Sequence, residues 1–107
     1  MTEQTRAQQL VGDFAPKLAE LTDDVLFADV WKREGLSPRD RSLATVSALV
    51  MGGNTEQLVS HVRLALSNGV TVAELGETMT HLAFYAGWPK ALSAITVARR
   101  VIAEVQQ

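Results

Sequence analysis

Hydrophobic positions in this chain recur every three to four residues, which is the period of one face of an α-helix. The stretch 72–86 is a clear example, and its apolar face holds Leu75, Met79, Leu82, Ala83 and Ala86. No stretch shows the sustained apolar–polar alternation, bounded by turn residues, that is typical of a strand. The pattern predicts an all-α fold, a compact bundle of five to six helices joined by short loops.

Two helices are predicted in the N-terminal third. Residues 3–14 form at best a short helix, because the weak apolar pattern there breaks at Pro16. Thr22 is followed by two aspartates, which is typical of an N-cap and an acidic first turn. The apolar positions after it predict a helix that ends near Gly35.

A clearer start signal lies at Ser37 and Pro38. Serine is a good N-cap residue, and proline is tolerated at the first helical position because its missing N–H has no partner there in any case. This helix is expected to reach about Met51 and to stop at Gly52 and Gly53.

Capping-box patterns predict the next two helix starts. Asn54 stands three residues before Gln57, and Thr71 stands three residues before Glu74. Gly69 separates the two helices and suits the left-handed conformation that often ends a helix.

A last helix is expected after Gly87, opening at Pro89 and reaching about Val105. Its predicted buried stripe contains Leu92, Ile95, Val101, Ile102 and Val105.

Length and composition indicate one domain, residues 1–107. The chain has three prolines and seven glycines, with no tract that would serve as a linker, and 47% of its residues are hydrophobic. So small a domain cannot bury several strongly apolar helices alone, so a homo-oligomer is expected.

Charge and residue usage exclude several classes of function. The formal charge is −2 and no basic run is present, so no nucleic-acid partner is expected. There is no leader pattern and no apolar run of about 20 residues, so we expect a cytoplasmic protein with no membrane contact. The chain has no cysteine, so it can form no disulfide and no thiolate nucleophile.

His61 is the main candidate for chemistry. It lies three residues after Leu58, on the side of its helix that should face the core, where an ionisable ring needs a partner. One interpretation is a half-buried histidine bonded to a nearby carbonyl. The other is a site at which His61 meets Arg41 and Ser42 from the preceding helix, if the two helices pack antiparallel.

His81 is a weaker candidate. Glu77, His81 and Tyr85 share one helical face, which favours a hydrated polar interface between subunits over a proton relay. With two histidines on different helices and no ligand-spaced pair, no metal site is predicted.

Three segments of the sequence resemble the carboxymuconolactone decarboxylase family, from about residue 27 to the C-terminus. They read WKREGLSPRDRSLATVSALV, EQLVSHVRLALSNGVTVAELGE and FYAGWPKA. The matching positions are Trp31, Arg33, Gly35, Arg41, Ser42, His61, Asn68, Gly69, Tyr85, Gly87 and Pro89. The resemblance implies the alkylhydroperoxidase-D-like fold, and a hexamer built as a trimer of dimers.

The same resemblance separates two branches of the family. The peroxidase branch carries two cysteines where this chain has Asn54 and Gln57, so thiol peroxidase chemistry is not expected. The decarboxylase branch usually has glutamate at position 57 and a small apolar residue at position 88, where this chain has Gln57 and Trp88.

The resemblance implies a cofactor-independent decarboxylase or double-bond isomerase acting on a small carboxylated lactone. Arg33 and Arg41 would clamp the anionic substrate, Ser42 would donate to a carbonyl or carboxylate oxygen, and His61 would supply the proton. The pocket would also contain Trp31, Gln57, Tyr85 and Trp88. The alternative is a non-catalytic ligand-binding or oligomeric member of the same fold, which Gln57 and Trp88 favour.

Overall fold

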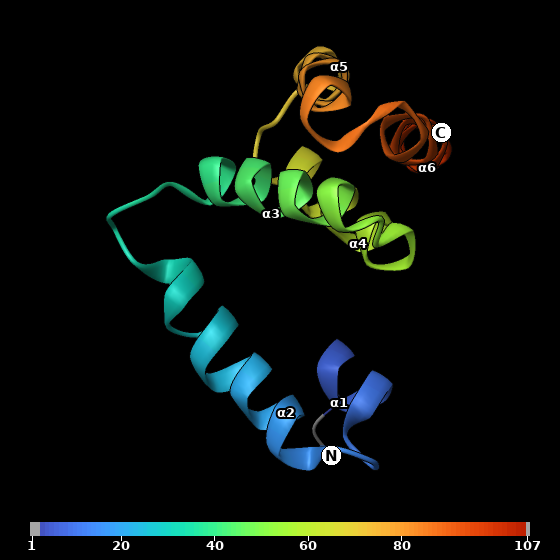
Figure 1. Ribbon diagram of the computed structural model, residues 1–107. Coiled ribbons are helices and arrows are strands. Elements are labelled where there is room, and N and C mark those ends of the chain that lie inside the picture. Colours follow the sequence, from blue (N-terminus) through green and yellow to red (C-terminus); the bar gives the residue numbers. More distant parts are fainter. Residues whose placement is uncertain (1–2, 107) are drawn as a thin grey trace. The chain divides into compact units, whose positions relative to one another are not determined.

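The computed structural model describes residues 3–106, and all of its regular structure in that range is helical (Figure 1). The predicted all-α fold is therefore confirmed. The chain divides into two compact units, the first ending at Ser37 and the second beginning at Pro38.

The first unit contains two short α-helices, α1 (Arg6–Val11) and α2 (Pro16–Leu21). A π-helical segment, η1 (Thr22–Phe27), follows α2 directly, and a 3₁₀ turn, η2 (Val30–Lys32), comes next. The short helix predicted within residues 3–14 is confirmed as α1.

The predicted helix start at Thr22 is wrong. Pro16 stands in the first turn of α2 and begins the helical segment, and the backbone of Thr22 is itself helical, with φ −61° and ψ −47°. The Thr22 hydroxyl donates back to the Leu18 carbonyl at 2.7 Å. Threonine inside a helix satisfies its hydroxyl in this way, so its presence did not mark an N-terminus.

The first unit has little core of its own. Among the described residues of this unit, Ala19 alone is buried. By contrast, Phe14 is 93% exposed and Leu10 is 65% exposed. A unit this small with so little buried apolar area needs another surface to stabilise it.

The second unit is a four-helix arrangement of α3 (Pro38–Gly52), α4 (Thr55–Ser67), α5 (Val72–Ala86) and α6 (Trp88–Val105). All four starts lie within one residue of the predicted positions. In this unit α3 packs on α4 and α5, and α6 packs on α4 and α5 (Figure 1).

The two capping-box predictions have different outcomes. Thr71 Oγ1 accepts from Glu74 N at 3.1 Å, and Glu74 Oε1 accepts from Thr71 N at 2.9 Å, so this box is confirmed. Asn54 is the N-cap of α4 but its side chain makes no capping hydrogen bond, so that box is wrong. Gly69 has φ 96°, the left-handed conformation predicted for it.

The core of the second unit joins all four helices. Its members are Val46, Val50, Leu58, Val62, Ala65, Val70, Leu75, Met79, Ala94, Val97, Ala98 and Val101. The predicted stripe of α6 is partly wrong, because Leu92 is 57% exposed and Val105 is 48% exposed. The buried face of α6 instead centres on alanines, which let neighbouring helices approach closely.

Candidate active site

Helices α3 and α4 form an antiparallel hairpin around the Gly52–Gly53 turn. At the far end of this hairpin, Asn68 Nδ2 donates to Ser42 Oγ at 3.0 Å. This hydrogen bond sets the register of the pair, because it places the end of α4 level with the first turns of α3.

The two flanks of α4 face different neighbours. Arg63 Nη2 lies 3.0 Å from Glu104 Oε2 of α6, so one flank faces α6. Asn68 faces α3, and the helical spacing places His61 and Gln57 on the same stripe as Asn68, seven and eleven residues earlier. His61 therefore lies on the α3 side of α4, at the edge of the core.

The two edges of helix α3 also face different neighbours. Arg39 forms an ion pair with Glu74 of α5, so that edge of α3 faces α5. Arg41 and Thr45 lie on the opposite edge, towards α4, and the Thr45 hydroxyl donates to the Arg41 carbonyl at 2.8 Å. We call the side of the hairpin turned away from α5 and α6 the polar flank; its members are Arg41, Ser42, Thr45, Gln57, His61 and Asn68.

Burial differs among the predicted site residues of the polar flank. Ser42 is 1% exposed, and among the described residues of the second unit it alone is both polar and buried. Arg41 and His61 are partly buried, and two of their nitrogens, Arg41 Nε and His61 Nδ1, are inaccessible to solvent. Gln57 is exposed. A guanidinium and an imidazole that are both partly desolvated interact with an anion more strongly than exposed side chains do.

The residues of the polar flank lie at two different heights along the α3–α4 hairpin. Ser42 and Arg41 lie level with Asn68, and His61 is seven residues back along α4. At a rise of 1.5 Å per residue, the backbone of His61 lies about 10 Å further along the hairpin. The arrangement is elongated, which suits a ligand with a charged group at one end and a reacting carbon at the other.

Trp31 and Arg33 belong to the first unit. Trp31 is partly buried and stacks on Phe27, with ring centroids 5.9 Å apart and an interplanar angle of 21°. Arg33 follows η2 in extended conformation, and its backbone N–H donates to the Val30 carbonyl at 3.2 Å.

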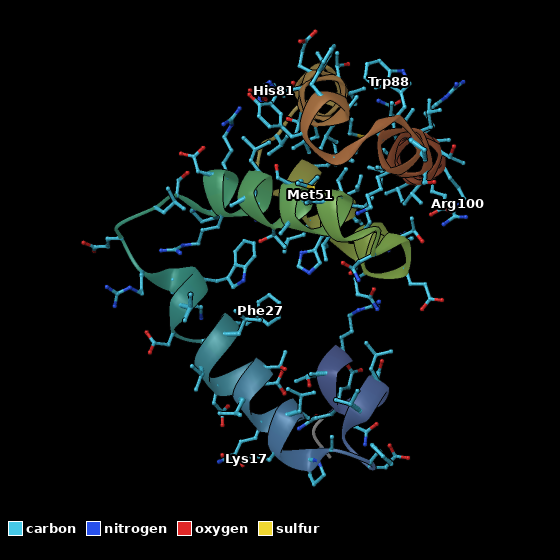
Figure 2. The ribbon with its side chains drawn as sticks, in the orientation of Figure 1. Lys17, Phe27, Met51, His81, Trp88 and Arg100 are labelled. Carbon is cyan, nitrogen blue, oxygen red and sulfur yellow. The ribbon has the colours of Figure 1, made fainter. Side chains whose placement is uncertain are left out.

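Tyr85 and Trp88 lie where α5 passes into α6, and both are largely exposed, at 68% and 55%. Tyr85 contacts His81, with ring centroids 4.9 Å apart, and Trp88 contacts Phe84 edge-on at 5.1 Å. Figure 2 shows His81 and Trp88 pointing outward from this pair of helices. The predicted sharing of one helical face by His81 and Tyr85 is confirmed.

The α5–α6 turn is tied to the C-terminal end of α3, because Lys90 Nζ donates to the Met51 carbonyl at 2.8 Å. Ser42 lies nine residues earlier in α3, which corresponds to about 13 Å along the helix. Within the second unit, the structure therefore does not bring Trp88 next to Ser42.

Asn68 matches the family pattern, but the sequence interpretation gave it no role in the site. Its local context indicated a helix end, where its backbone N–H donates to the Leu64 carbonyl at 2.9 Å. Its side-chain bond to Ser42 depends on the packing of two helices, which no local pattern encodes.

Among residues 3–106, no group of three histidine, cysteine, aspartate or glutamate side chains is placed to hold a metal ion. No helix in this range is long and apolar enough to cross a membrane.

Comparison with known proteins identifies a family match over most of the chain. Residues 16–100 match the carboxymuconolactone decarboxylase family. A 4-carboxymuconolactone decarboxylase from Acinetobacter baylyi is 32% identical over 94% of this chain and 75% of its own length.

Two other relatives match a smaller part of their own length. A nitrosuccinic acid decarboxylase from Metarhizium robertsii is 35% identical over 78% of this chain and 58% of its own. An uncharacterized 15.0 kDa protein from Paracoccus denitrificans is 36% identical over 76% of this chain and 62% of its own. The chain thus spans less than two thirds of the length of these two relatives.

Proposed function

Because this chain belongs to the carboxymuconolactone decarboxylase family, we propose that it is a cofactor-independent decarboxylase acting on a small dicarboxylate. The departing carboxylate would be conjugated with an electron-accepting group of the same molecule. The observation that carries this proposal is the polar flank, where a partly buried guanidinium, Arg41, and a partly buried imidazole, His61, lie on one side of the α3–α4 hairpin.

The chemistry needs no external electron acceptor. In γ-carboxymuconolactone the bond between the γ-carbon and its carboxylate breaks, and CO₂ leaves. The electron pair passes through the ring double bond to the carbonyl oxygen of the lactone and forms a dienolate. One proton is then added to the carbon next to the carbonyl, so the protein must bind an anion, stabilise the developing negative charge and deliver one proton.

The relative named for nitrosuccinic acid supports a substrate class defined by this electron flow. In a nitro dicarboxylate, loss of the carboxylate beside the nitro group moves the electron pair onto the nitro oxygens instead of the lactone carbonyl oxygen. Protonation at carbon again completes the reaction. Both substrates carry a second carboxylate that is not lost and to which the protein can bind.

The two ends of the polar flank suggest a division of roles. Arg41 would hold the remaining carboxylate in a bidentate grip, and Ser42, at the same end, would donate to that carboxylate. His61, about 10 Å away along the hairpin, would supply the proton to carbon. Of the two acceptors considered for Ser42, a carbonyl or a carboxylate oxygen, the register favours the carboxylate.

The remaining predicted site residues have roles that only the family resemblance implies. By that resemblance, Arg33 would supply a second positive charge and Trp31 an apolar contact to the substrate. Gln57, one turn before His61 on the same stripe, would be a neutral neighbour of the proton donor. Tyr85 and Trp88 would contact substrate only in a homo-oligomer, such as the hexamer that the family resemblance implies, where a neighbouring copy supplies them.

The test is ultraviolet-monitored turnover of γ-carboxymuconolactone and of nitrosuccinate by the purified protein, with CO₂ release as an independent check. We expect turnover of at least one compound without added metal or cofactor. A protein that binds these anions without releasing CO₂ would instead support the non-catalytic, ligand-binding alternative. Turnover that required an added cofactor would contradict the proposed mechanism.

A further inference from the structure

The hydroxyl group of Ser42 has an unusual environment for a hydroxyl inside a helix. Five threonines in the described helices donate their hydroxyl to the carbonyl four residues earlier. The one nearest to Ser42 in the sequence is Thr45, whose hydroxyl lies 2.8 Å from the Arg41 carbonyl oxygen. For Ser42 the corresponding carbonyl is that of Pro38. The hydrogen bond that the described residues give Ser42 Oγ is instead the one it accepts from Asn68.

Asn68 also lies close to the carbonyl that Ser42 would otherwise use. Its Nδ2 lies 3.0 Å from Ser42 Oγ and 3.5 Å from the Pro38 oxygen. A carbonyl oxygen can only accept a hydrogen bond, so the amide nitrogen, not the amide oxygen, must face this pair. The Ser42 oxygen thus acts as an acceptor, and its proton is not used by its own helix.

The backbone around Asn68 holds this amide in place. Asn68 N donates to the Leu64 carbonyl at 2.9 Å, and Val70 N donates to the Ala65 carbonyl at 2.9 Å. Gly69, in left-handed conformation at φ 96°, lies between them. The side chain therefore projects from a fixed helix end towards α3.

We propose that Asn68 is a positioning residue for substrate binding: it keeps the Ser42 hydroxyl proton available to a substrate carboxylate held by Arg41. This inference rests on the proposed function, because it assigns a part to the anion-binding end of the same polar flank. Ser42 is 1% exposed, so a hydrogen bond from its hydroxyl to an anion would form at low dielectric, where it is stronger than in water.

The first test compares Asn68→Ala with Ser42→Ala. Without the amide, the Ser42 hydroxyl can turn and donate to the Pro38 carbonyl, as threonines elsewhere in this fold donate to theirs. Both variants should therefore raise KM by about 10-fold to 100-fold, the range for a lost hydrogen bond to a charged group, with kcat within about three-fold of wild type. Asn54→Ala is the matched control, because Asn54 flanks the opposite, N-terminal end of α4 and its side chain makes no capping hydrogen bond, so its KM should not change.

Asn68→Asp reverses the polarity of the same contact. A carboxylate of nearly the same shape can only accept, so Ser42 would donate to it and the two helices would stay linked. KM should rise as in Ser42→Ala, and the melting temperature should fall, because a carboxylate cannot donate to the nearby Pro38 carbonyl oxygen. The added charge also repels an anion, so each Asn68 variant is repeated in the Ser42→Ala background, where Asn68→Ala should add less than about two-fold to KM.

A binding measurement separates this inference from the proposed function. The probe is the saturated analogue of γ-carboxymuconolactone, which lacks the ring double bond and cannot lose CO₂ by the same route; its Kd is measured by calorimetry. Weaker binding by Asn68→Ala and Ser42→Ala, with no additivity, supports the inference even if the wild type shows no turnover. Wild-type KM and Kd in Asn68→Ala, or fully additive effects, would overturn it. A wild-type protein that neither binds the probe nor turns over substrate would overturn both proposals.

Discussion

Arg39 of α3 and Glu74 of α5 form an ion pair that joins the N-terminal ends of two core helices. The same carboxylate accepts from the backbone of Thr71 at 2.9 Å, as part of the capping box that starts α5. One side chain thus both begins a helix and fixes that helix to its neighbour, next to the end of α3 that carries Arg41 and Ser42.

Glu74→Ala should lower the free energy of unfolding by about 1–2 kcal/mol. The lost cap contributes roughly 1 kcal/mol, and an ion pair with side chains 36% and 41% exposed contributes less than about 1 kcal/mol because solvent screens it. Urea denaturation measures the change. Glu104→Ala, which breaks only an exposed pair with Arg63, is the control and should cost less than about 0.5 kcal/mol. Equal losses in the two variants would contradict this account of Glu74.

His61→Gln should lower kcat by roughly 10²–10⁴-fold and change KM much less, if His61 delivers the proton to carbon. Glutamine has a similar size and keeps an N–H donor group, but it cannot exchange a proton near neutral pH. Steady-state kinetics on the active substrate and the melting temperature are measured together. A variant with a lower melting temperature and nearly unchanged kcat would show that His61 is a structural core histidine.

Arg41→Lys should act mainly on binding, raising KM by about 10-fold while kcat stays close to wild type. Lysine keeps the positive charge but loses the planar fork that grips a carboxylate through two hydrogen bonds. Arg63→Lys, on the other flank of α4, is the matched control and should leave KM unchanged. A fall in kcat with KM unchanged would place Arg41 at the reacting carbon instead of at the binding end.

The protein should show no thiol-dependent reduction of peroxides above background. No cysteine is present anywhere in the chain, so neither a peroxidatic thiolate nor a resolving disulfide can form. Consumption of hydroperoxide coupled to a dithiol reductant is the assay, on protein treated with a chelator. Sustained hydroperoxide consumption in this assay would contradict the predicted absence of peroxidase activity.

The protein should be a homo-oligomer at micromolar concentration, with a mass that is a multiple of 11.6 kDa. Large apolar side chains are exposed in both units, among them Phe14 at 93% and Phe84 at 74%, and a lone copy would leave them in water. Light scattering after size-exclusion chromatography gives the mass directly. A monomer would remove the proposed contribution of Tyr85 and Trp88 to the pocket.

Most helix boundaries of the second unit could be predicted because their signals are local. Pro38 opens α3, Thr71 and Glu74 cap α5, and Gly69 adopts the left-handed conformation, all through atoms within a few residues. Where a local signal has two uses, the prediction failed. Thr22 is of a good capping type, but inside a helix its hydroxyl donates back to Leu18.

The buried face of α6 shows why a hydrophobic pattern is not sufficient. Large residues such as Leu92 were predicted to face the core, yet Leu92 is 57% exposed and Ala94 is 1% exposed. Small side chains allow helices to pack closely, and which stripe is buried depends on the neighbouring helices as well as on its own hydrophobicity.

The sequence by itself determined the all-α class, the positions of the four long helices and the residue types able to bind an anion and move a proton, because propensity, capping and side-chain chemistry are properties of short segments. Only the tertiary structure decided that Asn68 meets Ser42 and that His61 lies on the α3 side of α4. It also decided that Trp88 lies at the opposite end of α3 from Ser42. These relations depend on the register and facing of packed helices, which are set by the whole core and by no single segment.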